Sequence, residues 1–267
     1  MTTPQPLRVA LVQGATRWHD PAANRDYYGQ LIAPLRGSDL VVLPETFTSG
    51  FSNEAIHSAE DMDGPTVAWL AAQARRLDAA VCGSVQLRVR DQVFNRLLFA
   101  TPDGAVRHYD KRHLFRHADE HKRYAAGSER IVLEWRGWRI ALMVCYDLRF
   151  PVWSRNRYDE AAQRFDYDLV VYVANWPSAR RHAWRTLLAA RAIENLAFCV
   201  GVNRVGYDGN DLHYAGDSVA HDFLGQPLVE VGAQEQVVTV ALDAAALAAH
   251  RERFPAWLDA DRFELSP

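Results

Sequence analysis

Residues 138–151, WRIALMVCYDLRFP, form the most informative stretch of this chain. The first half, Trp138–Val144, is an apolar run of strand length that only Arg139 interrupts. Apolar runs without polar alternation are typical of strands that are buried on both faces. Cys145 follows directly and opens a polar segment that Pro151 ends. Because ligands of α/β proteins bind at the carboxyl ends of strands, Cys145 stands where a functional side chain is expected.

Similar patterns recur on both sides of this stretch and predict a mixed α/β fold with helices covering sheets. Strands are predicted at 7–13, 39–43, 79–89, 93–100, 106–109, 131–135, 169–174, 197–202, 217–222 and 237–242. Helical spacing of apolar residues occurs at 22–36, 65–77, 183–195 and 244–250. Pro102-Asp103-Gly104 and Arg136-Gly137 predict hairpin turns.

The composition is that of an ordinary globular protein. The 267 residues are 49% hydrophobic and 24% charged, with a formal net charge of -3, which argues against a nucleic-acid partner bound through bulk positive charge. No apolar run is long enough for a membrane span, and the N-terminus MTTPQPLRV does not resemble a signal peptide. Without an internal repeat or linker, we expect one domain over 1–267. Its aromatic tail, 251–267, is expected to dock on the same subunit or on a partner.

The cysteines indicate the compartment. Three sparse cysteines do not make a disulfide framework, and they suit a reducing cytoplasm. Cys82 and Cys199 lie inside apolar runs, so we interpret them as core residues.

Two other polar side chains also follow predicted strands. Glu45 comes after 39–43 in LPETF, and Lys111 comes after 106–109 in YDKRHLF. A thiol nucleophile needs a base, and an oxyanion needs a positive donor. Each residue alone has a plainer interpretation, as a buried structural cysteine or a solvated loop side chain. Together with Cys145 they supply every group that nucleophilic catalysis requires.

Other kinds of site find little support. His113, His117 and His121 are spaced by four residues, as on a metal-binding helix face, but H-E-x-x-H is absent and basic residues crowd the segment. We therefore expect no metal. G-x-S-x-G, G-x-G-x-x-G and C-x-x-C are also absent.

The three motifs together resemble a known family. Glu45 in LPETFTSGF, Lys111 in YDKRHLF and Cys145 in VCYDLRFPVW look like the Glu-Lys-Cys triad of the nitrilase superfamily of carbon–nitrogen hydrolases. Within it the chain resembles the bacterial omega-amidases, a Nit-protein-like branch that hydrolyses the side-chain amides of 2-oxoglutaramate and 2-oxosuccinamate. Segments that also resemble this branch are YVANWP (172–177), ARAIEN (190–195) and FPAW (254–257).

The resemblance implies an α/β fold of the four-layer α-β-β-α type, with subunits that pair as homodimers. It implies no metal and no organic cofactor, and a small-molecule amide as the substrate. We expect neither a nucleic acid nor a membrane as a partner. The family also has a second glutamate seven residues before a glycine. Glu120 precedes Gly127 by that interval and takes this position.

The resemblance also implies a mechanism through a thioester. Glu45 would take the Cys145 proton, and the Lys111 cation would favour the thiolate. Lys111 and the backbone N–H of Tyr146 would hold the oxyanion. Glu45 would then protonate the departing ammonia and activate a water, while Glu120 positions Lys111 or that water.

Residues around the three motifs are candidates for binding the substrate. The substrate carboxylate calls for a cation, and the candidates are Arg116, Arg180, Arg181 and Arg185. Aromatic residues that flank the motifs are pocket candidates or core residues, namely Phe47, Phe51, Phe115 and Trp176. We expect Asp147 and Arg149 to pair and to hold the turn after Cys145.

Two other functions remain open. The first is an amidase of the same superfamily that acts on N-carbamoyl amines, deaminated glutathione or nitriles. The second is a binding or scaffold protein that keeps the fold without catalysis, against which the intact triad argues.

Overall fold

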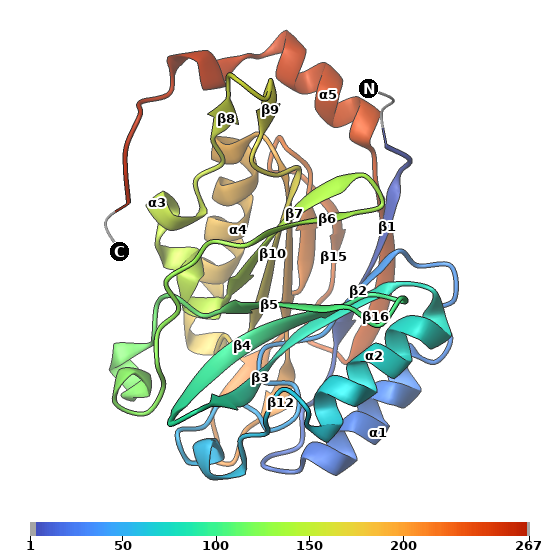
Figure 1. Ribbon diagram of the computed structural model, residues 1–267, viewed down its shortest axis with the longest axis vertical. Coiled ribbons are helices and arrows are strands. Elements are labelled where there is room, and N and C mark those ends of the chain that lie inside the picture. Colours follow the sequence, from blue (N-terminus) through green and yellow to red (C-terminus); the bar gives the residue numbers. More distant parts are fainter. Residues whose placement is uncertain (1–3, 266–267) are drawn as a thin grey trace.

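The computed structural model describes residues 4–265, and two six-stranded sheets form its centre (Figure 1). The first sheet runs in the order β16 (Gln236–Leu242), β1 (Leu7–Gln13), β2 (Leu40–Val42), β3 (Ala80–Val89), β4 (Gln92–Ala100), β5 (Val106–Asp110). The second runs in the order β15 (Pro227–Glu230), β14 (Val219–His221), β11 (Phe198–Asn203), β10 (Leu169–Ala174), β7 (Trp138–Val144), β6 (Val132–Trp135). Two-stranded ribbons are formed by β8 (Tyr158–Asp159) with β9 (Arg164–Phe165) and by β12 (Val205–Tyr207) with β13 (His213–Ala215).

Helices cover the outer face of each sheet. The α-helices are α1 (Pro21–Ile32), α2 (Pro65–Leu77), α3 (Pro151–Ser154), α4 (Arg181–Asn195) and α5 (Ala244–Arg253). Helices α1 and α2 contact each other, and α2 packs on β3 and β4 of the first sheet, whereas α4 packs on β11 and β14 of the second. In Figure 1 the pair α1 and α2 lies on the opposite side of the sheets from α4. The expected four-layer α-β-β-α arrangement is confirmed.

The alternation of side chains along β1 shows how one strand serves two layers. Leu7, Val9 and Leu11 belong to the core that includes the residues of β7 and β10, between the sheets. Ala10 and Val12 point the other way and join the core under α1 and α2. Successive side chains of a strand point to opposite faces, so a fully apolar run is what a buried layer requires.

Most elements lie where the sequence predicts them. Helix α2 has the predicted bounds, because Pro65 begins it and Asp78 ends it in a left-handed conformation. The hairpin at Arg136-Gly137 is confirmed, with φ of 48° and 80° at the two turn residues. The helix predicted over 22–36 is wrong at its end, since α1 stops at Ile32. The strands β8, β9, β12, β13 and β15 are not predicted, because runs of two to four residues show no periodicity.

Part of the aromatic tail contacts the subunit, whereas Phe254 and Leu258 are exposed. Helix α5 continues to Arg253, beyond the expected start of the tail. Trp257 then stacks on Tyr158 with ring centroids 3.8 Å apart, and Arg262 bonds Glu160. Residues 266–267 of the predicted tail lie outside the described part of the chain.

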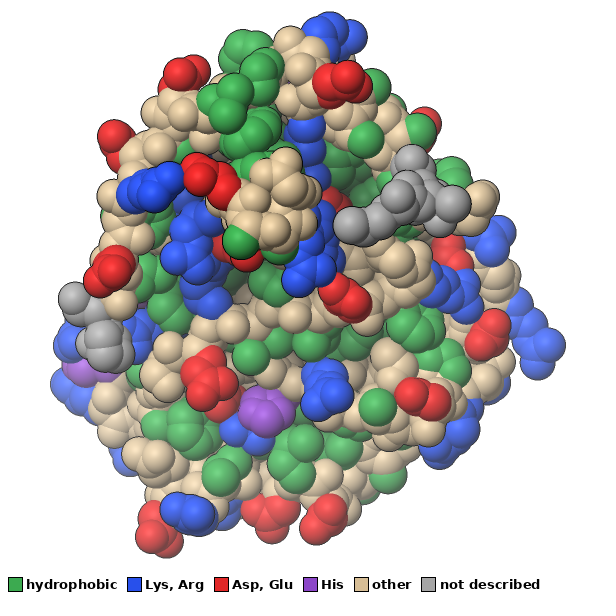
Figure 2. All heavy atoms as spheres, turned by 45° about the horizontal axis from the view of Figure 1, so that its top comes forward, with side chains coloured by type: hydrophobic (Ala, Val, Ile, Leu, Met, Phe, Trp, Pro, Cys, Tyr) green, Lys and Arg blue, Asp and Glu red, His purple; other side chains and the backbone are tan. Residues whose placement is uncertain are grey.

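Charged side chains of both signs are mixed on the described surface that Figure 2 shows. Lysines and arginines alternate there with aspartates and glutamates. Within residues 4–265, no helix has the length and apolar character needed to cross a bilayer.

Candidate active site

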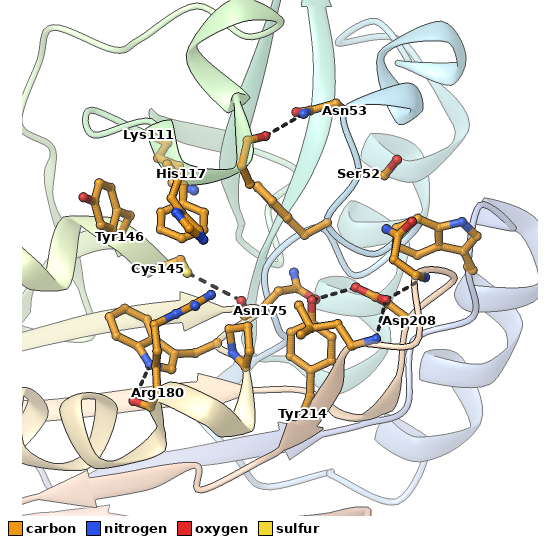
Figure 3. Close-up of a pocket in the computed structure, with 18 of the residues that line it drawn as sticks. Ser52, Asn53, Lys111, His117, Cys145, Tyr146, Asn175, Arg180, Asp208 and Tyr214 are labelled. Atoms are coloured by element: carbon orange, nitrogen blue, oxygen red, sulfur yellow. Dashed lines mark hydrogen bonds between the residues drawn. The ribbon is translucent and has the colours of Figure 1, made fainter.

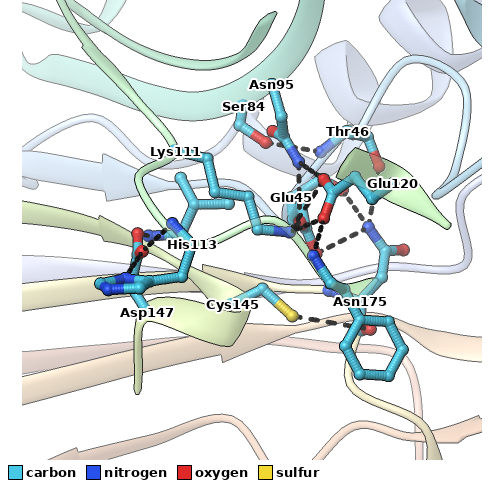
Figure 4. A network of polar contacts seen from close by, with 12 residues as sticks. Glu45, Thr46, Ser84, Asn95, Lys111, His113, Glu120, Cys145, Asp147 and Asn175 are labelled. Atoms are coloured by element: carbon cyan, nitrogen blue, oxygen red, sulfur yellow. Dashed lines mark hydrogen bonds and ion pairs between the residues drawn. The ribbon is translucent and has the colours of Figure 1, made fainter. Parts of the chain in front are cut away.

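Four strands deliver polar side chains to one place between the sheets. In the first sheet β2 is parallel to β3, and two antiparallel steps make β5 run the same way. In the second sheet β7 and β10 are parallel. Glu45, Lys111, Cys145 and Asn175 therefore follow the carboxyl ends of β2, β5, β7 and β10. The two sheets bring these ends together (Figure 4).

Two carboxylates share one ammonium group at the centre of the site. Lys111 Nζ donates to Glu45 Oε1 at 2.9 Å and to both Glu120 oxygens, at 3.0 and 2.9 Å. Lys111 is 1% exposed, and both glutamates are fully buried. Asn95 Nδ2 adds bonds of 2.8 Å to Glu45 and 3.3 Å to Glu120. Buried charges of this kind are stable only when they are paired and hydrogen-bonded, as they are here.

Asn175 connects Glu45 to Cys145. Its backbone N–H donates to Glu45 Oε2 at 2.7 Å, and its side-chain Nδ2 donates to the Glu45 carbonyl at 2.7 Å and to Thr46 Oγ1 at 2.8 Å. Its backbone carbonyl accepts the Cys145 thiol at 3.9 Å. The base and the thiol are thus fixed to the same residue of the second sheet.

The backbone is strained where two of these strands end. Cys145 and Thr46 adopt φ values of +45° and +41°, in the left-handed region that non-glycine residues avoid. Such strain is typical of functional turns. Cys145 also begins the 3₁₀ turn Cys145–Arg149, whose first N–H groups, including that of Tyr146, have no acceptor within the turn.

Asp147 ties the lysine loop to the cysteine turn. Its Oδ1 accepts the backbone N–H of His113 at 2.9 Å and contacts His113 Nδ1 at 2.8 Å, while Oδ2 accepts Tyr109 Oη at 2.8 Å and the Val144 N–H at 3.0 Å. Tyr109 and His113 flank Lys111, and Val144 precedes Cys145. This fully buried carboxylate therefore fixes the distance between the lysine loop and the cysteine turn.

The predicted Asp147–Arg149 pair is wrong. All the bonds of Asp147 go to the groups just named, and the Arg149 guanidinium instead lies over the Trp176 ring, 5.0 Å from its centroid. The reason is that Asp147 points into the core whereas Arg149 is exposed.

Glu120 and Gly127 lie on one loop, and both residues contact the segment around Lys111. Gly127 N–H donates to the Lys111 carbonyl at 2.9 Å. A Cβ at Gly127 would lie 2.1 Å from the Asp110 carbonyl oxygen, so only glycine allows this approach. Glu120 Oε2 also accepts the Phe115 N–H at 2.6 Å, which fixes the carboxylate against Lys111.

Burial and charge decide the resting protonation states. Burial raises the pKa of the Cys145 thiol well above its usual range; the Glu45 carboxylate adds to the shift, and the Lys111 ammonium opposes it. Burial alone would lower the pKa of Lys111, but the carboxylates of Glu120 and Glu45 outweigh it and raise that pKa. Lys111 is therefore a permanent cation. Lys111 favours the thiolate as expected, but burial and Glu45 outweigh it, and the cysteine rests as a thiol.

This raised pKa predicts how the free protein reacts with an alkylating agent. Carbamidomethylation of Cys145 by iodoacetamide, without substrate, is expected to be slow at pH 7 and to accelerate with pH through and beyond about 8.5, the ordinary thiol pKa. The measurement is the rate of mass gain on the Cys145 peptide from pH 5 to 10. A rate that levels off below pH 7 would show a stable thiolate and contradict this assignment.

Cys145 opens onto a pocket of about 590 Å³ (Figure 3). Three of the predicted pocket residues, Phe51, Phe115 and Trp176, line this pocket, and Tyr146 lines it as well. The prediction that Phe47 lines the pocket is wrong. Phe47 is fully buried against Tyr28 and Trp69 beneath the first sheet, because it points to the helix-covered face.

Two arginines line the pocket, and one of them was a predicted candidate. Arg180 lines it, with its guanidinium 5.2 Å from the Phe115 centroid, and so does Arg149. Within residues 4–265, neither forms an ion pair. Arg181 pairs instead with Asp217 at 2.7 Å and Arg185 with Glu230 at 3.2 Å, and neither they nor Arg116 lines the pocket.

The three spaced histidines do not share a helix face. His113 bonds Asp147, His117 lines the pocket, and His121 lies in the separate 3₁₀ turn Glu120–Lys122. Over residues 4–265, no group of three or more His, Cys, Asp or Glu side chains could hold a metal ion.

Two contributors to the site, Asn95 and Asn175, had no assigned role from the sequence, and Arg149 was expected to pair with Asp147 rather than to line the pocket. Asn95 could have been noticed as an amide in the middle of the mostly apolar strand β4. Asn175 could have been noticed at the end of β10, the neighbour of the strand that precedes Cys145.

Comparison with known proteins places this geometry in a family. A model of the carbon–nitrogen hydrolase family matches residues 8–252. The chain belongs to this family. It is 48% identical over 260 residues to an omega-amidase, YafV, of Escherichia coli K12, covering 97% of this chain and 98% of that protein. It is 35% identical to a 2-oxoglutaramate amidase of Bacillus subtilis, covering 83% and 85% of the two chains.

A solved structure shows the same fold and matches closely in sequence. It is that of a carbon–nitrogen hydrolase superfamily protein from Xanthomonas campestris, with an arsenic adduct in its active site. It is 68% identical and superimposes with a TM-score of 0.97, covering 98% of this chain and all of that one.

Proposed function

We propose that this protein hydrolyses the omega-amide of 2-oxo-dicarboxylate monoamides, such as 2-oxoglutaramate and 2-oxosuccinamate, to the 2-oxo acid and ammonia. The observation that carries the proposal is a buried Glu45–Lys111–Glu120 cluster beside Cys145, at a pocket that also presents two arginines with no carboxylate partner among residues 4–265. The omega-amidase and 2-oxoglutaramate amidase relatives support the same substrate class.

The first half of the reaction forms a thioester. Because the thiol rests protonated, Glu45 takes the Cys145 proton as the sulfur attacks the amide carbon. Lys111 Nζ and the Tyr146 N–H stabilise the oxyanion, each such donor contributing about 3 kcal/mol. Glu45 then passes its proton to the amide nitrogen, the C–N bond breaks, and ammonia leaves.

The second half hydrolyses the thioester. Glu45, again a carboxylate, removes a proton from water, and the hydroxide attacks the thioester carbon. The C–S bond breaks, the sulfur recovers the proton from Glu45, and the 2-oxo acid leaves. Glu120 does not react in this scheme. It holds the Lys111 ammonium where the oxyanion forms.

Arg180 and Arg149 are proposed to bind the substrate carboxylate. Each guanidinium lies on an aromatic ring and keeps its donors free of ion pairs within the described residues. We predict that Arg180→Ala raises the KM for 2-oxoglutaramate about tenfold to a hundredfold, the range for losing a charged hydrogen bond, with a smaller effect from Arg149→Ala.

The control for this prediction is Arg185→Ala, which removes an exposed arginine already paired with Glu230. It is expected to leave KM unchanged. If Arg180→Ala had a normal KM, or if the control had the larger effect, the carboxylate would bind elsewhere.

The activity itself is tested by comparing substrates. Ammonia release is measured from 2-oxoglutaramate, 2-oxosuccinamate, an N-carbamoyl amine, deaminated glutathione and an aliphatic nitrile. We expect the highest kcat/KM for the first two. A preference for any of the other three would select the alternative amidase or nitrilase specificity.

The homodimer, the single domain and the cytoplasmic location stay predictions. Light scattering is expected to give twice the 30.2 kDa mass of the chain.

A further inference from the structure

The pocket has two ends of different character. In Figure 3, Tyr146, Cys145 and Arg180 lie at one end, and Asp208 lies at the other, beside Tyr214. We call the first the arginine end. We call the second the distal arm and define it by its lining residues Trp18, Glu54, Asp208, Leu212 and Tyr214.

The distal arm is not needed by the substrates proposed above. The pocket volume of about 590 Å³ lies within the range of about 300–1,000 Å³ that encloses drug-sized ligands. A short monoamide, bound between Cys145 and Arg180, leaves the arm unfilled.

The aromatic wall of the arm is rigidly placed. A Cβ at Gly209 would lie 2.3 Å from Trp18 Nε1, and one at Gly50 would lie 3.0 Å from Trp18 Cε3. The indole therefore packs directly against the backbone of both glycines. Leu212, which is 40% exposed, adds a second apolar surface.

The charge of the arm is negative. Asp208 accepts Tyr214 Oη at 2.9 Å and the Asn210 N–H at 2.8 Å. Glu54, which pairs with His57 at 3.7 Å, is exposed on the same pocket. The lysine and arginines among the described lining residues belong to the other end. Arg204 lies behind Tyr214, 4.8 Å from its ring centroid, and is buried away from the pocket.

The geometry of an amide assigns this arm to the amine side. The three substituents of a carbonyl carbon diverge in a plane. If the oxygen lies at Lys111 and Tyr146, and the acyl chain runs to Arg180, the nitrogen faces away from the arginine end. Asn175, which holds the proton donor Glu45, lies between Cys145 and Asp208 in Figure 3.

We propose that the distal arm binds the amine substituent of secondary omega-amides, and that the enzyme also hydrolyses N-substituted monoamides whose amine carries an aromatic or apolar group. Trp18, Leu212 and Tyr214 supply the apolar surface, and Asp208 and Glu54 disfavour an amine that carries a carboxylate. This inference rests on the proposed omega-amidase function.

A secondary amide is cleaved through the same steps as the primary amide. The Cys145 sulfur forms a bond to the acyl carbon, the C–N bond breaks, and the nitrogen takes the proton from Glu45. A free primary amine leaves in place of ammonia. Water then hydrolyses the same thioester, so both substrates give the same 2-oxo acid.

The test uses 2-oxoglutaramate, its N-benzyl amide and its N-carboxymethyl amide, with the common product 2-oxoglutarate as the readout. We expect the wild type to hydrolyse the benzyl amide with a kcat/KM at least tenfold above that of the carboxymethyl amide. Trp18→Ala and Leu212→Asp are expected to lower kcat/KM for the benzyl amide by about 10–200-fold, the range for an apolar contact, and to change that for the primary amide little. The second variant alters an exposed side chain and therefore leaves the fold intact.

The outcomes separate this inference from the function it rests on. If the primary amide is hydrolysed and the benzyl amide is not, or if the variants affect both substrates equally, the distal arm does not bind the amine. If neither substrate is hydrolysed, both this inference and the proposed omega-amidase function are overturned.

Discussion

Replacing Cys145 with alanine is expected to lower kcat for 2-oxoglutaramate by at least about 10⁴-fold, to background hydrolysis. The thiol is the only nucleophile among the described lining residues that lies beside the Glu45–Lys111 pair, and without it no thioester can form. The fold is expected to stay intact, with an unfolding temperature within about 4 °C of wild type, because the change removes only one small side-chain atom. Steady-state kinetics and differential scanning calorimetry provide the two measurements.

The matched control is Cys199→Ala, in which an equally small atom is removed from a fully buried core strand. This variant is expected to lose some stability and keep its activity. Normal turnover by the Cys145→Ala variant would contradict the thioester mechanism outright.

Replacing Lys111 with methionine is expected to affect activity and stability together. Loss of one oxyanion donor lowers kcat by about 10²–10³-fold. The change also leaves two fully buried carboxylates, Glu45 and Glu120, without their shared counter-charge. Breaking a buried ion pair in this way costs about 3–5 kcal/mol, which corresponds to an unfolding temperature lower by roughly 10 °C.

A double variant separates the two effects. Lys111→Met combined with Glu120→Gln removes one of the unpaired charges, so stability is expected to recover in part while activity stays low. Unfolding temperature and kcat are measured for both variants. A normal kcat in the Lys111→Met variant would exclude Lys111 as an oxyanion donor. A normal unfolding temperature in that variant would show that the Lys111 charge does not stabilise the buried carboxylates.

The layers and the strand ends could be predicted from the sequence because each depends on local pattern. The apolar runs that became β2, β7 and β10 place Glu45, Cys145 and Asn175 at strand ends. The parallel strands β7 and β10 bring Cys145 and Asn175 to one edge of the second sheet. The packing of the first sheet on the second brings Glu45 to them. Lys111 follows a shorter strand, and its place depends on the pairing of β5 with β4.

The parts that could not be predicted depend on which way a loop side chain points. Phe47 and Phe51 both belong to the Glu45 motif, but Phe47 turns beneath the first sheet and Phe51 turns into the pocket. Asp147 and Arg149 are two residues apart on one 3₁₀ turn, which sends one into the core and the other to the pocket. Trp18 and Asp208 both line the distal arm although they are far apart in the sequence. No local sequence pattern predicts that two such distant residues come together.

We expect omega-amide hydrolysis by this protein to pass through a thioester on Cys145. This expectation is tested most directly by mixing the protein with excess 2-oxoglutaramate, quenching with acid during turnover, and measuring the mass of the peptide that contains Cys145. We predict a gain equal to the acyl group on that peptide, absent from the Cys145→Ala protein and lost as substrate is exhausted. Turnover of 2-oxoglutaramate with no acyl group at any time on the Cys145 peptide, and with activity retained in the Cys145→Ala protein, would contradict it.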